Sequence, residues 1–384
     1  MKTLLLICLS WLVLSTTSAQ WQQLRNNTDG DKITSFAVRD TNLFTGSSIE
    51  GIMLSTNNGS TWSYKRDGLV NHSTSSITIT GNNIFAGSSQ GGLSVSTNNG
   101  SSWITIASLI TNCLASNSTN IFAGTKVGVY TYTNNGTSWL RTNIGLASSI
   151  VNTIAISGIN IFAGTAGGGV FLSTNNGSSW SAMNNGLTHD TINCVAINNN
   201  NIFAGTNGGV FLSTNNGSSW TAVNNGLTNH SVRSIAFSGN NIFAGTSGGV
   251  FLSGCNGGKW DPANVGLTIA QVNCFATKDA FLFAGLDDGT IWKRPLSQLM
   301  GIEELKIDQN IKIYPNPVAD NLVIEFSDFR NSKVELINME GKLLKNFSLQ
   351  STETTLNIGS LESGIYFLKI YNEAGVVVRK LIKQ

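Results

Sequence analysis

The sequence predicts an all-β protein, in which a seven-bladed β-propeller closed by its N-terminal strand precedes a small C-terminal β-sandwich. A tryptophan recurs every 36 to 41 residues, and a Phe-Ala-Gly triplet, once Phe-Thr-Gly, recurs with the same period. Four short strands in about 40 residues are typical of a propeller blade, because one blade alone cannot bury both of its faces. The tryptophans are Trp21, Trp62, Trp103, Trp139, Trp180, Trp220 and Trp260.

One repeat, residues 151–185, illustrates the expected blade. Apolar and polar residues alternate over 151–157, and short apolar runs follow at 161–164, 170–173 and 180–183, separated by Gly- and Asn-containing turns. Alternation bounded by such turns predicts four antiparallel strands. No repeat holds a helix-length periodic stretch, which excludes a solenoid of helix pairs.

The two ends of the repeat array are incomplete in complementary ways. Trp21 has no Phe-Ala-Gly unit before it, whereas the last unit, residues 272–294, has no tryptophan strand after it. We therefore predict that residues 21–25 supply the outer strand of the blade that begins at Val272, which closes the ring and removes an open sheet edge.

The N-terminus has the features of a signal peptide. Met1 and Lys2 precede an apolar run over 4–14, and small residues at 17–19 suit cleavage. A membrane anchor is the alternative, but the run is shorter than the about 18–20 residues that a span needs, and no later segment reaches that length. We expect a signal peptide at 1–19, the propeller at 20–294, a linker at 295–305 and a C-terminal domain at 306–384.

Composition excludes several classes of partner and cofactor. Only 11% of the residues are charged and the net charge is +2, so no basic patch for nucleic acid is expected. Cys113, Cys194 and Cys274 occupy the same place in three different repeats, too far apart to pair, so we interpret them as small core residues. Cys255 lies in a turn and has no expected partner.

The turn before most of the tryptophans has a fixed pattern. It reads Ser-Thr-Asn-Asn-Gly-Ser-Thr-Trp over 55–62 and recurs at 96–103, 173–180 and 213–220. It resembles the Asp-box, or BNR repeat, of sialidases, sortilin-like receptors, xyloglucanase-type hydrolases and photosystem-assembly propellers. An amide oxygen still accepts hydrogen bonds from the turn backbone, so we expect the structural role to survive and a charge-dependent role to be lost. Asparagine replaces the family's aspartate at Asn57, Asn98, Asn134, Asn175 and Asn215, and Cys255 stands in the last box.

The C-terminal segment, residues 306–384, is of a different kind. Its short alternating strands and Asn- or Gly-containing turns predict a small β-sandwich. The segments Ile-Tyr-Pro-Asn-Pro at 313–317, Met-Glu-Gly-Lys-Leu at 339–343, Gly-Ile-Tyr at 364–366 and Val-Arg-Lys-Leu-Ile-Lys at 378–383 occur in order. Together they resemble the type A C-terminal sorting domain of type IX secretion.

This resemblance implies an address and a partner. It implies that the type IX secretion machinery binds the C-terminal domain and carries the protein through the periplasm to the outer surface or the medium. An ordinary appended binding domain is the alternative. The residues carried over as the sorting motif are Tyr314, Pro315, Asn316, Pro317, Gly364, Tyr366, Lys380 and Lys383.

A catalytic reading of the propeller is disfavoured. A glycosidase needs two carboxylates about 5–10 Å apart, and a sialidase also needs clustered arginines. The arginines are scattered through the repeats without a shared position, and most acids lie near the ends of the array. The acids of the propeller are Asp29, Asp31, Asp40, Glu50, Asp67, Asp190, Asp261, Asp279, Asp287 and Asp288.

We expect two loops of each blade to face one rim, and this rim is otherwise neutral and rich in Asn, Ser and Gly. His72, His189 and His230 lie in such loops of blades that are not all adjacent, so no metal site and no cofactor are expected. The candidates for ligand contact are Glu50, Asp67, Lys126, Asp287 and Asp288.

These expectations lead to a non-enzymatic propeller that binds an extracellular protein or glycan. The alternatives are a glycan hydrolase with a rim carboxylate pair and a largely structural coat protein.

Overall fold

The computed structural model describes residues 20–26, 30–133, 139–148, 150–268, 270–299, 311–326, 332–338, 343–349, 351–372 and 375–384. The signal peptide predicted at 1–19 lies outside these residues. The chain divides into two compact units, residues 1–300 and 301–384, which are described separately. No helix among the described residues is long and apolar enough to cross a membrane.

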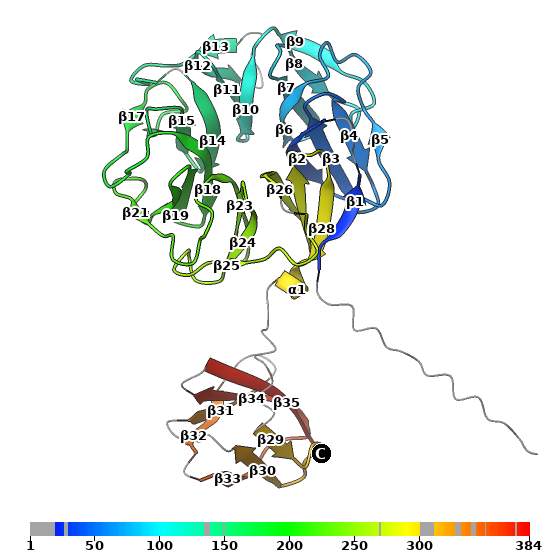
Figure 1. Ribbon diagram of the computed structural model, residues 1–384, viewed down its shortest axis with the longest axis vertical. Coiled ribbons are helices and arrows are strands. Elements are labelled where there is room, and N and C mark those ends of the chain that lie inside the picture. The colour runs from blue at the N-terminus through cyan, green and yellow to red at the C-terminus, as the bar shows by residue number, and fades with distance from the viewer. Residues whose placement is uncertain are drawn as a thin grey trace, which may run out of the picture. The chain divides into compact units, whose positions relative to one another are not determined.

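The described strands of the first unit form seven antiparallel sheets of four strands each. In Figure 1 the sheets stand side by side around a centre, with the longest edge of each facing outwards. From the inner to the outer strand they are β2–β5 (Ile33–Arg39, Asn42–Ser47, Ile52–Ser55, Ser63–Tyr64), β6–β9 (Thr74–Thr80, Asn83–Ser88, Leu93–Ser96, Ile104–Ala107), β10–β13 (Thr111–Ser116, Asn120–Thr125, Gly128–Thr133, Trp139–Arg141), β14–β17 (Val151–Ser157, Asn160–Thr165, Val170–Ser173, Ser181–Ala182), β18–β21 (Ile192–Asn198, Asn201–Thr206, Gly209–Ser213, Thr221–Ala222), β22–β25 (Val232–Ser238, Asn241–Thr246, Gly249–Ser253, Asp261–Pro262), and β26, β27, β28 and β1 (Val272–Lys278, Phe281–Leu286, Ile291–Pro295, Gln22–Arg25).

The last sheet joins the two ends of the array. Strand β1 pairs antiparallel with β28, with Gln22 opposite Lys293, so the pairing predicted from the incomplete ends is present. Each inner strand lies against the inner strand of the next sheet, and β26 lies against β2. The contacts between inner strands therefore run right round the ring.

The Phe-Ala-Gly triplets lie on the second strand of each sheet, where the chain is most deeply buried. Phe162 and Ala163 on β15 are almost fully buried. A Cβ on Gly164 would lie 2.6 Å from side-chain atoms of Thr153 and Ile192, the latter on the next sheet. Glycine is therefore required because neighbouring sheets approach closely at this point.

The repeated tryptophans join each sheet to the one before it. The indole N–H of Trp220 donates to the backbone oxygen of Met183 at 2.8 Å, and that of Trp260 donates to Val223 at 2.7 Å. Trp21 makes the equivalent bond to Ala263 at 2.7 Å. A buried indole N–H needs a partner, and here the preceding sheet supplies it.

The turn before Trp180 shows why asparagine suffices in the repeated box. The Asn175 side-chain oxygen accepts from the backbone N–H of Ser179 and from the hydroxyl of Ser173, both at 2.9 Å. Its amide nitrogen donates to the Ser179 hydroxyl at 2.8 Å. The predicted acceptor role is confirmed, and the amide adds a donor that a carboxylate would lack.

The first unit extends past Arg294, where the sequence predicted a linker. Pro295 ends β28, and the short helix α1 (Leu296–Leu299) follows with Leu296 and Leu299 buried against the closing sheet. These two apolar side chains explain why the chain stays packed here.

The second unit contains two antiparallel sheets that share one apolar core. That core includes Phe326, Leu336 and Leu368. The sequence predicted five of the seven strands and missed β29 and β32. The first sheet is β29 (Ile311–Tyr314), β30 (Asn321–Phe326) and β33 (Glu353–Asn357), and the second is β32 (Leu343–Ser348), β31 (Lys333–Asn338), β34 (Gly364–Asn372) and β35 (Gly375–Lys383).

Candidate functional site

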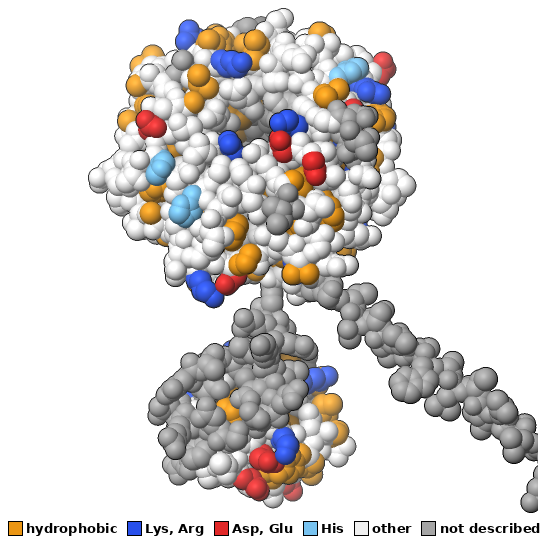
Figure 2. Space-filling view, in the orientation of Figure 1, with side chains coloured by type: hydrophobic (Ala, Val, Ile, Leu, Met, Phe, Trp, Pro, Cys, Tyr) orange, Lys and Arg blue, Asp and Glu red, His pale blue; other side chains and the backbone are white. Residues whose placement is uncertain are grey.

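One face of the ring carries all the loops that the sequence singled out, and we call it the connection face. Figure 2 shows a ring face on which most side chains are neutral, with blue and red side chains beside the central hollow. The connection face consists of the links between second and third strands, at 48–51, 89–92, 126–127, 166–169, 207–208, 247–248 and 287–290, and the links into each inner strand, at 26–32, 65–73, 108–110, 142–150, 183–191, 223–231 and 263–271.

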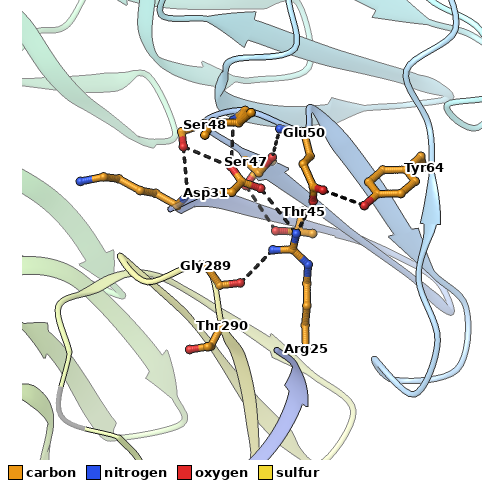
Figure 3. Close-up of polar contacts among 12 residues, drawn as sticks. Arg25, Asp31, Thr45, Ser47, Ser48, Glu50, Tyr64, Gly289 and Thr290 are labelled. Atoms are coloured by element: carbon orange, nitrogen blue, oxygen red, sulfur yellow. Dashed lines mark hydrogen bonds and ion pairs between the residues drawn. The ribbon is translucent and has the colours of Figure 1, made fainter. Parts of the chain in front are cut away.

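Arg25 and Glu50 form the centre of a charged cluster on this face (Figure 3). Arg25, at the end of β1, forms an ion pair with Glu50 and donates to the Gly289 backbone oxygen at 2.8 Å. The second Glu50 oxygen accepts from the Tyr64 hydroxyl at 2.9 Å. That hydrogen bond is the main reason why the pKa of Tyr64 is raised.

Asp31 lies beneath this cluster and is only 1% exposed. Its carboxylate lies 3.5 Å from the Arg25 guanidinium and accepts from the Ser48 hydroxyl and the Ile49 backbone N–H. A buried carboxylate is tolerated because a cation and two donors compensate it. Arg25 therefore links the closing sheet to the first sheet.

Asp287 is held by the same seam between the last and first sheets. Its carboxylate forms an ion pair with Lys32 at 2.9 Å, and Asn273 donates to it at 3.5 Å. Glu50 and Asp287 therefore lie on either side of the segment that leads into β2, each engaged by a cation from that segment or from β1.

The opposite face of the ring repeats this arrangement. Lys278, at the end of β26, is buried and donates to the Asn58 side chain at 2.6 Å and to Asp279 at 2.7 Å. Lys293 donates to the backbone oxygen of Asn58 at 3.3 Å. Charged side chains thus hold the closing seam at both of its ends.

The three other predicted contact residues are not gathered at one point. Asp67 and Lys126 are exposed on different sheets, and the Asp67 backbone oxygen accepts from the Trp103 N–H at 2.8 Å. Asp288 accepts from the backbone and hydroxyl of Thr290 within its own turn. These five residues do not form a single site.

The histidines are spread along the connection face. His72, His189 and His230 are exposed on links into three different inner strands. Among the residues described, no three His, Cys, Asp or Glu side chains are grouped to hold a metal ion.

The sequence interpretation missed a belt of hydrogen bonds at the mouth of the ring. The second residue of six inner strands donates through its side chain to the first residue's carbonyl in the next inner strand. The bonds run from Thr34 to Thr74, Ser75 to Thr111, Asn112 to Val151, Asn152 to Ile192, Asn193 to Val232 and Asn273 to Ile33.

The seventh position of the belt is Arg233, on β22. Ser234 makes the bond to Val272 in its place, at 3.3 Å. An alignment of the repeats at this position, where Thr, Ser or Asn otherwise stands, is the signal that would have separated Arg233 from the other scattered arginines.

The thiols of the equivalent cysteines are chemically quiet. Cys113, Cys194 and Cys274 are free, and burial raises the pKa of Cys113 and of Cys194 to about 12. Burial also raises the pKa of Cys274. Cys113 and Cys194 are partly rather than fully buried as whole residues, but their role as small packing residues is consistent with the prediction. Cys255 is exposed.

In the second unit, parts of the predicted sorting motif meet although they are far apart in sequence. The Asn316 amide donates to the Lys380 backbone oxygen at 2.8 Å and accepts from the Ile382 N–H at 2.9 Å. Gly364 pairs with Lys383, and the Tyr366 hydroxyl donates to the Glu362 backbone at 2.9 Å. Tyr314, Pro315, Pro317 and Lys380 are exposed, whereas Lys383 is buried.

Comparison with known families identifies the second unit. Residues 312–384 match the family described as the secretion system C-terminal sorting domain. This domain belongs to type IX secretion and indicates export to the cell surface or beyond. No curated protein matches the sequence of the chain.

Solved structures identify the fold of the first unit. YCF48 bound to D1 peptide is 15% identical, with a TM-score of 0.61, over 73% of this chain and 98% of that chain. YCF48 from Cyanidioschyzon merolae gives 15%, 0.60, 72% and 99%. A GH74 enzyme of Niastella koreensis gives 17%, 0.53, 68% and 43%, so the match spans less than half of that enzyme. These are β-propeller proteins, and the likeness extends to the fold alone.

Proposed function

We propose that the protein is an exported, non-enzymatic binding module, a closed seven-bladed β-propeller delivered by a β-sandwich sorting domain. The pairing of β1 with β28 and the contact of β26 with β2 support a closed ring of seven blades. The match over 312–384 supports delivery by the sorting domain. In this layout the signal peptide occupies 1–19, the propeller begins at residue 20 and ends with α1, and a linker leads to the sorting domain.

The observation that carries the non-enzymatic reading is the engagement of the central carboxylates by cations of the protein itself. Both Glu50 oxygens are occupied, one by Arg25 and one by Tyr64, and Asp287 is held by Lys32. Glycoside hydrolysis needs one carboxyl group to give a proton and another to attack or to activate water. Carboxylates that brace the closing seam favour a structural role for these acids.

The rest of the connection face suits binding of two kinds. Hydroxyl and amide groups of Asn207, Ser231, Ser247 and Gln271 dominate the links of the later sheets. The links of the first sheets carry most of the exposed aliphatic side chains. A polar region beside an apolar one favours recognition of an extended ligand through hydrogen bonds and contact area together.

The experiment that tests this proposal uses the complete mature chain on a panel of neutral and acidic polysaccharides and extracellular proteins. Binding is read on the immobilised panel, and release of soluble products is read by mass spectrometry. We expect binding without product. Product release would instead support a glycan hydrolase, the second candidate, which the likeness to a GH74 enzyme favours.

Delivery is tested separately in the producing cells. Removal of residues 312–384 should leave the propeller in the periplasm, whereas the complete chain should reach the surface or medium. Equal export of both forms would contradict the assigned role of the C-terminal domain.

A further inference from the structure

Arg233 breaks a structural rule that the other six blades obey. The corresponding side chains are Thr, Ser or Asn, and each bonds to the backbone of the next blade. Ser234 takes over this bond at 3.3 Å, longer than the 2.9 Å from Asn193 to Val232. A substitution that weakens a repeated contact is expected at a functional position.

The Arg233 guanidinium is left without a partner inside the protein. Its Nε is buried and has no hydrogen-bond acceptor, and no carboxylate forms an ion pair with it within the part of the chain that is described. Burial of a charged donor without an acceptor is destabilising. An acceptor supplied from outside the chain would remove this penalty.

The surroundings of Arg233 are polar and neutral. A chain of side-chain hydrogen bonds runs over the links beside it, from Asn193 through Asn207, Ser231, Ser247 and Gln271 to Asn273. The nearest acid along this chain, Asp287, is already paired with Lys32. The positive charge of Arg233 is therefore uncompensated at the mouth of the ring, where Figure 2 shows the hollow of a ring face.

We infer that Arg233 binds the carboxylate of an acidic sugar, a uronate unit of an extracellular polysaccharide. A guanidinium matches a planar carboxylate with two parallel hydrogen bonds, and the flanking amides and hydroxyls are suited to sugar hydroxyls. This inference rests on the proposed binding function and names its ligand class.

A sugar fits this half of the face better than a peptide does. Among the described links of the connection face, six of the seven exposed aliphatic side chains lie between residues 48 and 150, away from β22, and the seventh is Val265. These six are Ile49, Val70, Ile110, Val127, Ile144 and Ile150. The region around Arg233 thus offers hydrogen bonds and one charge.

The test measures binding of a hexagalacturonate by calorimetry to the complete mature chain and to Arg233→Asn. Asparagine is the residue of four other blades at this position, so it should restore the bond to Val272 and leave the unfolding midpoint unchanged or higher. We expect binding of the hexagalacturonate to weaken about 10- to 100-fold, the effect of losing a charge-assisted hydrogen-bond pair. Arg141→Asn, on an exposed outer strand, is the matched control and should bind as the parent does.

Three results would overturn the inference. They are equal binding by Arg233→Asn, equal binding of the carboxyl-reduced hexasaccharide, and no binding of the acidic probe by the parent chain. A preference for polyglutamate over the hexagalacturonate would point to an acidic peptide instead. Binding of neutral glycans alone would sink this inference but leave the proposed function intact, whereas cleavage of the probe would sink the proposed function.

Discussion

The seam between the fifth and sixth sheets and the seam that closes the ring are built from different chemistry. At the former, Trp260 bonds to Val223 and Asn193 to Val232, with no ion pair between the described residues of the two sheets. At the closing seam the Trp62 indole N–H is buried without a partner, and ion pairs of Arg25 and Lys32 are present instead. A repeated seam can be copied by duplication, but the closing seam joins the two chain ends and needs contacts of its own.

Removal of the closing strand, residues 20–25, should have the largest effect. It would remove Trp21, which is 2% exposed and bonds through its backbone to Val265 at 2.9 Å. The loss should exceed the about 3–5 kcal/mol of truncating one buried tryptophan, because β28 also becomes an open edge. Urea unfolding followed by circular dichroism measures it.

Removal of residues 312–384 is the control for the shortened chain. The two units are separately compact, so the propeller should keep its urea midpoint. An unchanged midpoint in the chain without residues 20–25 would refute the closing role of β1.

Arg25→Met should have the next largest effect. It leaves the Asp31 carboxylate buried without its cation, which typically costs about 3–5 kcal/mol of unfolding free energy. Lys259→Met is the matched control, because Lys259 and Asp261 are 65% and 64% exposed and such a pair contributes less than about 1 kcal/mol. Similar losses in both variants would mean that the closing seam is no more ionic than the surface.

Replacing tryptophan by phenylalanine should separate the two seams further. Trp220→Phe removes a buried hydrogen bond to Met183, whereas Trp62→Phe removes an indole N–H that has no partner. The first change should therefore destabilise by about 1 kcal/mol more than the second. Denaturant midpoints of the two variants give this difference directly, and equal midpoints would argue against it.

The smallest effect concerns the thiols. At pH 8 one cysteine of the folded mature chain, Cys255, should react with iodoacetamide, because burial protects Cys113, Cys194 and Cys274. Their raised folded pKa values also stabilise the fold below the usual thiol value of about 8.5, and this contribution should be lost as the pH rises towards 12. Rapid labelling of several thiols in the folded chain, counted by intact mass, would contradict the packing.

Sequence periodicity predicted the sheets well because each repeat carries its own strands, turns and anchoring tryptophan. It also predicted the pairing of β1, since the first tryptophan lacked a unit and the last unit lacked a tryptophan. It did not predict what Glu50 and Asp287 do, because their partners come from the other end of the array. Lys32 and Asp287, for example, are 255 residues apart.

The candidate site was only partly accessible from sequence for a related reason. Arg233 looks like any scattered arginine until the hydrogen-bond belt assigns a common role to its six counterparts. The sorting motif was recognisable as separate segments, but the bonds from Asn316 to the last strand follow only from the paired sheets.

The central claim is that the acids beside the ring opening brace the closing seam and do not act on substrate. The most direct test measures urea unfolding and product release from the polysaccharide panel in parallel for the parent chain and Glu50→Gln. We predict no product from either protein and a loss of about 1–3 kcal/mol in the variant, from the weakened bond to Arg25. Product release by the parent that disappears in Glu50→Gln, with unfolding unchanged, would contradict the account.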